Sequence, residues 1–221
     1  PAKPCTVQFL PEDAGRITVL SHAEADALMA AAIADADPYL WLFVAFGLHT
    51  GMRHSEITRT KFSEVDFERC RLFVSRAKRG AREQPITTTL RDILRREQAM
   101  VADPQGWIFP TGRTRRSKSG HRAAMNHSFR RAVVAAGLDP ALVSPHTMRH
   151  TAITNLVEDG ADIATIMAIS GHATSRMVLR YTHLRREHVD KAIAALDRAP
   201  NVPKTSPASR SGALVKFEKP G

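Results

Sequence analysis

The segment from Tyr39 to His49 constrains the fold most strongly, because it is apolar on almost every side. Asp37-Pro38 precedes it, and proline is favoured at the first position of a helix; Gly51 follows it and suits a helix end. A helix without a polar face must be covered on all sides by other elements. The sequence therefore predicts a central helix over 39–49, around which the rest of the core packs.

Most of the remaining chain carries helical patterns. Ser21 and Glu24 form a capping-box pattern, which predicts a helix from this point to about Ala36. Further helices are predicted over 53–60, 88–101, 125–136, 145–158, 162–170, 175–183 and 187–196. Three short runs, 65–67, 72–74 and 84–86, predict strands. We therefore expect a mostly α (α+β) fold, helical with a small three-stranded antiparallel sheet.

The two ends of the chain differ in composition from its middle. Residues 1–15 read as a linker, 16–198 as one domain, and 199–221 as a flexible basic tail rich in Pro and Ser. Inside the domain, 107–109 is a short stretch expected to be buried, and 111–122 lacks apolar periodicity and is expected to be an exposed loop.

Positive charge is concentrated in two segments. The chain has 32 Lys and Arg against 22 Asp and Glu, a net charge of +10, and the segments 69–82 and 113–131 contain no acidic residue. Such segments are typical of proteins that bind nucleic acid phosphates, although a pair of solvated loops is the alternative. The side chains predicted to contact DNA are Arg76, Arg79, Arg82, Arg113, Arg115, Arg116, Lys118 and Arg122.

The sequence favours a cytoplasmic protein. The longest apolar stretch, 39–48, is about half of the roughly 20 residues that span a bilayer, and the N-terminus has no signal-peptide pattern. Cys5 and Cys70 lie far apart and form no disulfide framework, which favours a reducing compartment. No membrane partner is expected.

One segment combines a helix start with several ionisable side chains. Ser144-Pro145 predicts the helix start and places His146 in the first turn, where free backbone N–H groups favour a phosphate. Arg149 lies on the same face. His146 and His150 also form an i, i+4 pair that could bind a metal ion, but no carboxylate or cysteine has matching spacing, and no metal is expected.

Phosphoryl transfer on a diester is the chemistry that these residue types suit as a group. Arginines can stabilise the extra charge of the transition state, and Lys or His can protonate the leaving oxygen. A tyrosine hydroxyl can attack, although its pKa of about 10 requires help from the site. With no carboxylate cluster for Mg²⁺ and no glycine-rich nucleotide loop, nuclease and kinase mechanisms are disfavoured, and no cofactor is predicted.

Five stretches of the sequence, in this order and spacing, resemble the tyrosine recombinase (phage integrase) family: Thr50–Glu56 (TGMRHSE), Lys78, His146–His150 (HTMRH), Gly171-His172 and Tyr181–His183 (YTH). The resemblance extends from about Arg16 to Asp197. It implies the family's fold, a catalytic domain over 16–198, and an enzyme that cuts and rejoins DNA at specific sites through a 3′-phosphotyrosyl intermediate.

The resemblance also implies how the phosphate would be held. Arg53 and Arg149 would clamp the scissile phosphate and His172 would hydrogen-bond it. Glu56 would support the site beside Arg53, and His150 would be a further supporting residue.

The remaining roles that it implies concern proton transfer. Tyr181 would attack the phosphorus, His146 would assist proton transfer to and from Tyr181, and Lys78 would protonate the 5′-oxygen. Lys61 and Arg79 are nearby competitors for the role of Lys78.

The expected partners follow from the same resemblance: double-stranded DNA with a specific recombination site, and further copies of the chain, as a tetramer on two duplexes. An apolar run at 213–217 could dock on a neighbouring copy. The family's usual N-terminal helical domain has no counterpart here, so we expect either the catalytic domain of a longer recombinase or a minimal member. The alternatives are a type IB topoisomerase or telomere resolvase, and a non-catalytic DNA-binding regulator.

Overall fold

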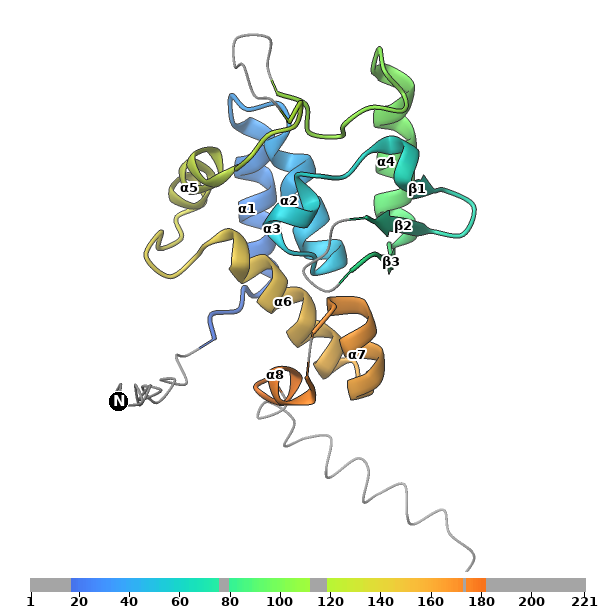
Figure 1. Cartoon of the computed structure of the whole chain (residues 1–221). Helices are drawn as coiled ribbons and strands as arrows, with labels where there is room; N and C mark the ends of the chain where they lie inside the picture. The colour runs from blue at the N-terminus through green and yellow to red at the C-terminus, as the bar shows by residue number, and fades with distance from the viewer. Residues whose placement is uncertain (1–16, 76–79, 112–118, 173, 182–221) are drawn as a thin grey trace, which may run out of the picture. The chain divides into compact units, whose positions relative to one another are not determined.

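The computed structural model describes residues 17–75, 80–111, 119–172 and 174–181. Figure 1 shows a small sheet at one side of the helices, next to α4. The elements are α1 (His22–Ala34), α2 (Leu40–Thr50), α3 (His54–Ile57), the 3₁₀ helix η1 (Phe62–Glu64), β1 (Val65–Asp66), β2 (Arg71–Val74), β3 (Arg82–Pro85), α4 (Thr88–Met100), α5 (Asn126–Ala135), α6 (Pro145–Glu158), α7 (Ile163–Ser170) and α8 (Ser175–Leu179). The expected fold, mostly helical with a three-stranded antiparallel sheet, is confirmed.

The sheet has the order β1-β2-β3, and both pairs are antiparallel. Its third strand begins two residues earlier than the predicted run 84–86, because Val74 pairs with Arg82 and Leu72 with Gln84. Gln84 is fully buried and its Nε2 donates to Thr50 O at 3.3 Å. The strand was expected, but its start lies at polar side chains whose partners in the folded chain an apolar pattern does not reveal.

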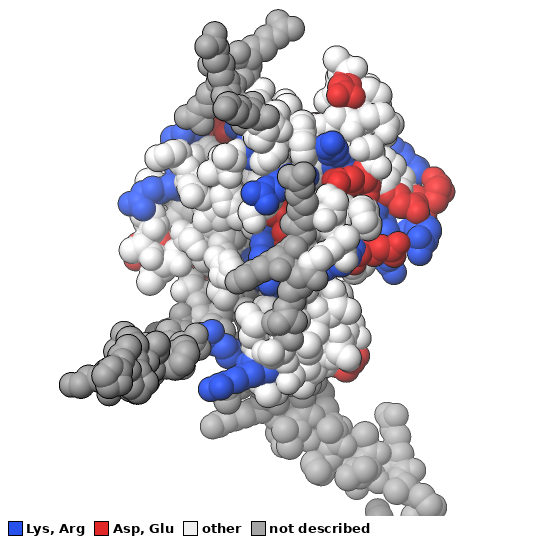
Figure 2. Space-filling model, in the orientation of Figure 1, with Lys and Arg blue, Asp and Glu red and all other residues white. Residues whose placement is uncertain are grey.

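Acidic and basic side chains are interleaved over the sheet and α4 (Figure 2). Arg69 lies 3.5 Å from Glu83, and Arg95 lies 2.7 Å from Glu68, all four side chains being more than half exposed. Exposed pairs of this kind contribute little to stability, but they reduce the positive charge that this surface presents.

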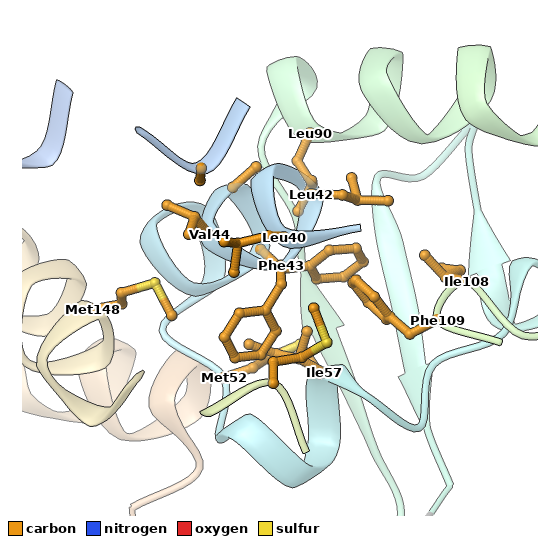
Figure 3. Packing of buried hydrophobic residues seen from close by; sticks show 14 of the residues in the cluster. Leu40, Leu42, Phe43, Val44, Met52, Ile57, Leu90, Ile108, Phe109 and Met148 are labelled. Carbon is orange, nitrogen blue, oxygen red and sulfur yellow. The ribbon is translucent and has the colours of Figure 1, made fainter. Parts of the chain in front are cut away.

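Helix α2 is the centre of the first hydrophobic cluster, as its sequence predicts. It packs against α1, α3, α4 and α6, and most of its side chains are buried (Figure 3). Phe43 meets Phe109 and Phe129 edge to face, with ring centroids 6.3 Å apart in both pairs. Gly47 allows α6 to approach closely, because a Cβ atom there would lie 2.7 Å from Cε of Met148.

The ends of α1 and α2 follow the expected chemistry. Ser21 and Glu24 form the capping box, with Ser21 N donating to Glu24 Oε2 at 2.8 Å. Gly51 ends α2 in the left-handed conformation, with φ of 61°, and its N–H donates to Gly47 O at 3.1 Å. This turn ends α2 and leads the chain through the buried Met52 into α3.

A second, smaller hydrophobic cluster lies between α6, α7 and α8. It consists of Ile153, Val157, Ile166, Val178 and Tyr181. Helix α6 belongs to both clusters, because Met148 on its first half is part of the first one. Helix α8 ends at Leu179, earlier than the predicted 183, and Tyr181 follows in a turn with its N–H donating to Val178 O at 2.9 Å.

The expectation of an exposed loop over 111–122 is wrong at its end. His121 is buried and pairs with Pro110 in an isolated β-bridge. Arg122 is held by Asp37 at 2.5 Å, and its guanidinium lies 4.7 Å from the ring centroid of Tyr39. Arg122 is therefore tied to the start of α2, and His121 to the segment that carries Pro110.

Several predicted segments lie outside the described residues: 1–15, 112–118, the helix 187–196, and the tail 199–221 with its apolar run 213–217. Within the part that the structure describes, no helix combines the length and the apolar character needed to cross a bilayer.

Candidate functional site

Arg53 follows the turn at Gly51 and precedes α3. Its Nη1 lies 3.1 Å from Glu56 Oε1, and its Nη2 donates to Gly171 O at 3.2 Å. The second bond joins two segments that are 118 residues apart in the sequence. The turn after α2 and the turn after α7 are thereby fixed to each other.

Glu56 is the buried carboxylate of this region. It is 4% exposed and binds two guanidinium groups, those of Arg53 and Arg82, the latter at 2.9 Å. Its Oε2 also accepts from the backbone N–H of Arg53 at 3.2 Å. One carboxylate thus orients two arginines.

Arg149 lies on α6 and is almost completely buried, with 2% exposure. Its Nη1 donates to Gly51 O at 2.6 Å, whereas Nη2 is buried with no hydrogen-bond partner among the described residues. Burial and the nearby charge of Arg53 lower the pKa of Arg149 to about 10, so the side chain remains charged at neutral pH. A buried, charged donor without a partner is costly unless a ligand satisfies it.

His172 comes directly after the left-handed Gly171, which ends α7 with φ of 63°. A Cβ atom on Gly171 would lie 2.8 Å from Arg82 Nε, so a residue with a side chain does not fit at this position. Nδ1 of His172 is 2.9 Å from the hydroxyl of Ser170. Burial, followed by the charges of Arg149 and Arg53, lowers the pKa of His172 to about 4, which leaves the ring neutral at pH 7.

Tyr181 is 4% exposed, and its hydroxyl lies 2.6 Å from Nδ1 of His150. Burial raises the pKa of Tyr181, and the positive charges of Arg149 and Arg180 act in the opposite direction. Burial also lowers the pKa of His150 to about 4. The phenol is therefore protonated, and the neutral imidazole beside it can accept its proton.

The structure pairs Tyr181 with His150 and not with His146, the histidine that the resemblance linked to it. His146 packs edge to face on His150, with ring centroids 4.8 Å apart. Burial, together with Arg149 and Arg53, lowers the pKa of His146. Since the two histidines are one turn apart on the same face of α6, the sequence alone does not distinguish between them.

Both arginines of the predicted DNA-contacting set that the structure describes are bound inside the chain. Arg82 is in β3 on Glu56, with its Nε buried and unpaired among the described residues, and Arg122 is on Asp37. The remaining predicted site residues lie outside the described residues: Lys78, Arg76, Arg79, Arg113, Arg115, Arg116 and Lys118.

Seven of the predicted site residues are brought together: Arg53, Glu56, His146, Arg149, His150, His172 and Tyr181. Neither Ser170 nor the contact of Arg82 with this group is evident from the sequence. Over the described ranges, no three His, Cys, Asp or Glu side chains are grouped as a metal site would require. The arrangement combines positive charge, neutral imidazoles and one phenol. It therefore suits the binding of an anion and the transfer of protons during a reaction of that anion.

The profile of the Phage integrase family matches residues 18–188, most of the chain. The chain belongs to the phage integrase family. Membership confirms the family that the five sequence stretches indicated.

Other family members give the extent of the similarity. Tyrosine recombinase XerD of Brucella suis biovar 1 is 29% identical over 152 residues, which cover 66% of this chain and 48% of that protein. The chain spans about half the length of the curated relatives it matches. The catalytic domain of bacteriophage HP1 integrase superposes with a TM-score of 0.61 at 25% identity, covering 80% of this chain and 94% of that domain. The Tn1549 transposon integrase, solved in complex with transposon right end DNA, shares the fold with a TM-score of 0.66 at 20% identity. The match covers 85% of this chain and 68% of that chain.

Proposed function

We propose that this phage integrase family chain contains the catalytic domain, over 16–198, of a site-specific DNA recombinase that acts through a 3′-phosphotyrosyl intermediate. The observation that carries the proposal is the buried Nη2 of Arg149, which has no hydrogen-bond partner within the described part of the chain and lies within electrostatic range of the Tyr181 hydroxyl. A phosphate oxygen would supply the missing acceptor, and the phenol would lie close to the phosphorus.

The charged groups suit the transition state of such a reaction. Attack of a phenolate oxygen on a phosphodiester adds about one negative charge to the phosphoryl oxygens, and preorganised donors stabilise that charge more strongly than water does. We assign this role to Arg53 and Arg149, with Glu56 holding Arg53 in place at 3.1 Å. His172 is the third proposed phosphate contact.

The proton balance is as follows. The Tyr181 oxygen forms a bond to phosphorus, the bond from phosphorus to the 5′-oxygen breaks, the phenol loses a proton and the 5′-oxygen gains one. His150 is the acceptor nearest to the phenol, at 2.6 Å, and His146 lies against it, so this pair would take the proton. Lys78 is proposed to protonate the 5′-oxygen. Because the phosphotyrosyl bond conserves the energy of the phosphodiester, rejoining would need neither ATP nor a metal.

The partners that we propose are double-stranded DNA with a specific recombination site and other copies of the chain, four on two duplexes. The DNA-bound state of the Tn1549 integrase, which has the same fold, supports the first. We place the reaction in the cytoplasm, at the nucleoid.

Covalent trapping tests the function. Labelled, nicked duplexes tiled across the DNA that flanks the gene would be incubated with the protein and separated on a denaturing gel, in buffer with and without EDTA. The parent should form an adduct in both buffers, and Tyr181→Phe should form none, because only the attacking hydroxyl is removed.

Tyr39→Phe is the matched control, since it removes the hydroxyl of the only other tyrosine, whose ring lies under Arg122. It should form the adduct like the parent. An adduct that persists in Tyr181→Phe would refute the assignment. Relaxation of a supercoiled plasmid without a cognate site would indicate a topoisomerase instead.

A further inference from the structure

Ser170 is the last residue of α7 and is completely buried. Its hydroxyl oxygen lies 2.6 Å from Ile166 O, one turn earlier in the helix, and 2.9 Å from Nδ1 of His172. This side chain is in neither the expected site nor the family motif, yet it contacts one of the rings that face the two arginines.

The bonding around this hydroxyl allows one arrangement of protons. A serine hydroxyl has one proton to donate, and a backbone carbonyl can only accept. Two oxygen atoms at 2.6 Å repel each other unless a proton lies between them, so the Ser170 proton points to Ile166 O. The contact with His172 then requires that Nδ1 carries the hydrogen and donates it to the serine oxygen.

We propose that Ser170 is a positioning residue that holds His172 as the Nδ1–H tautomer and leaves Nε2 as the proton-accepting nitrogen of the ring. The neighbourhood keeps the ring singly protonated. The charged and titratable groups that face it come from three places, namely Arg53 after α2, Arg149, His146 and His150 on α6, and Tyr181 after α8.

The tautomer of His172 is a property of the free protein and does not depend on the proposed function. Its role in catalysis rests on that function. In the free protein His172 offers a lone pair at Nε2, so it enters the reaction as an acceptor. It becomes a donor to a phosphate oxygen only after taking up a proton, which a bound phosphate favours by opposing the charge of Arg53 and Arg149. Binding of the diester and protonation of His172 are thereby coupled.

The tautomer can be measured directly in the full chain without DNA. Long-range ¹H–¹⁵N correlation spectra of ¹⁵N-labelled protein at pH 7.5 distinguish a protonated from an unprotonated ring nitrogen, and a His172→Gln variant identifies the signals. We expect Nδ1 protonated and Nε2 unprotonated in the parent. A neutral ring with Nε2–H, or a ring protonated on both nitrogens, would overturn the proposal whether or not the protein cuts DNA.

The Ser170→Ala variant tests the cause. Without the hydroxyl the Nδ1–H form loses one hydrogen bond, so the ratio of Nε2–H to Nδ1–H should rise about tenfold. Ser128→Ala is the control, because Ser128 is a buried serine of α5 whose hydroxyl also donates to a backbone carbonyl, that of Met125 at 3.2 Å. The control should leave the His172 spectrum unchanged. An unchanged tautomer in Ser170→Ala would show that the serine is not the cause, and a correct tautomer in a protein that forms no DNA adduct would refute the proposed function alone.

Discussion

Replacing Glu56 with Gln removes the negative charge that Arg53 and Arg82 share while keeping the size of the side chain. The carboxylate is 4% exposed, and its oxygens lie 3.1 Å and 2.9 Å from the two guanidinium groups. Arg149, which is buried, adds a third positive charge nearby. The variant should therefore lose stability through repulsion among cations that no longer have a counter-charge.

The size of the effect follows from the geometry. Each ion pair at about 4 Å is worth roughly 4 kcal/mol at an effective dielectric constant of about 20. The arginine side chains keep 24% and 17% exposure, so water offsets part of this energy. Breaking a buried pair by removing one partner typically costs about 3–5 kcal/mol, and we expect about 3 kcal/mol here. For a domain of this size that is a fall of about 6–12 °C in Tm.

Urea unfolding followed by circular dichroism measures this loss. Adding Arg82→Met to Glu56→Gln should recover about 1–2 kcal/mol, because it removes one of the repelling charges. Glu68→Gln is the control: it breaks the exposed pair with Arg95 and should cost less than about 1 kcal/mol. If Glu56→Gln and Glu68→Gln lose the same small amount, or if Arg82→Met gives no recovery, the reasoning from the shared carboxylate is refuted.

Two further predictions concern pH and packing. The folded chain lowers the pKa of His150 and His172 to about 4, below the unfolded value of about 6.5, so their contribution to stability is complete above pH 6.5 and is lost as the pH falls from 6.5 towards 4. Urea unfolding at pH 7.0 and 5.0 should show the loss, with a smaller difference in His172→Gln; equal stability at both pH values would contradict the assignment of neutral rings. Gly47→Leu should destabilise the fold by about 1–3 kcal/mol in the same assay, because even a Cβ atom would lie 2.7 Å from Met148 Cε, and an unchanged midpoint would mean that α2 and α6 separate without cost.

The central part of the fold could be predicted because local chemistry determines it. An all-apolar segment followed by Gly51 predicts a buried helix and its end, and Ser21 with Glu24 predicts the start of α1. The sequence pattern starts the third strand two residues too far along the chain, because Arg82 and Gln84 gain partners that only the folded chain provides. The hydrophobic pattern of the sequence therefore predicts an element correctly where the buried residues are the apolar ones.

The sequence does not show which charges of the two basic segments are free to bind DNA, because their partners lie far away in the sequence. Neither segment contains an acid, yet Arg131 is bound by Asp35 and Arg122 by Asp37, carboxylates 96 and 85 residues away in the sequence. The pairing of Tyr181 with His150 was also hidden, because a helical period places His146 on the same face. The motif indicated which residues come together, but the contacts between them depend on tertiary structure.

Helix α6 extends through both hydrophobic clusters, and this division has a consequence for partly unfolded molecules. Tyr181 belongs to the smaller cluster, whereas Arg53 adjoins Met52 in the larger one. A cluster with fewer buried apolar side chains opens at a lower free energy, so α7 and α8 should detach before the central helix unfolds. In such a molecule the turn at Gly171 and the phenol of Tyr181 would move away from Arg53 at the same time. If the proposed function holds, a chain with α7 and α8 detached would still present Arg53 but would have no phenol beside it, so partial unfolding would abolish cleavage before it abolishes anion binding.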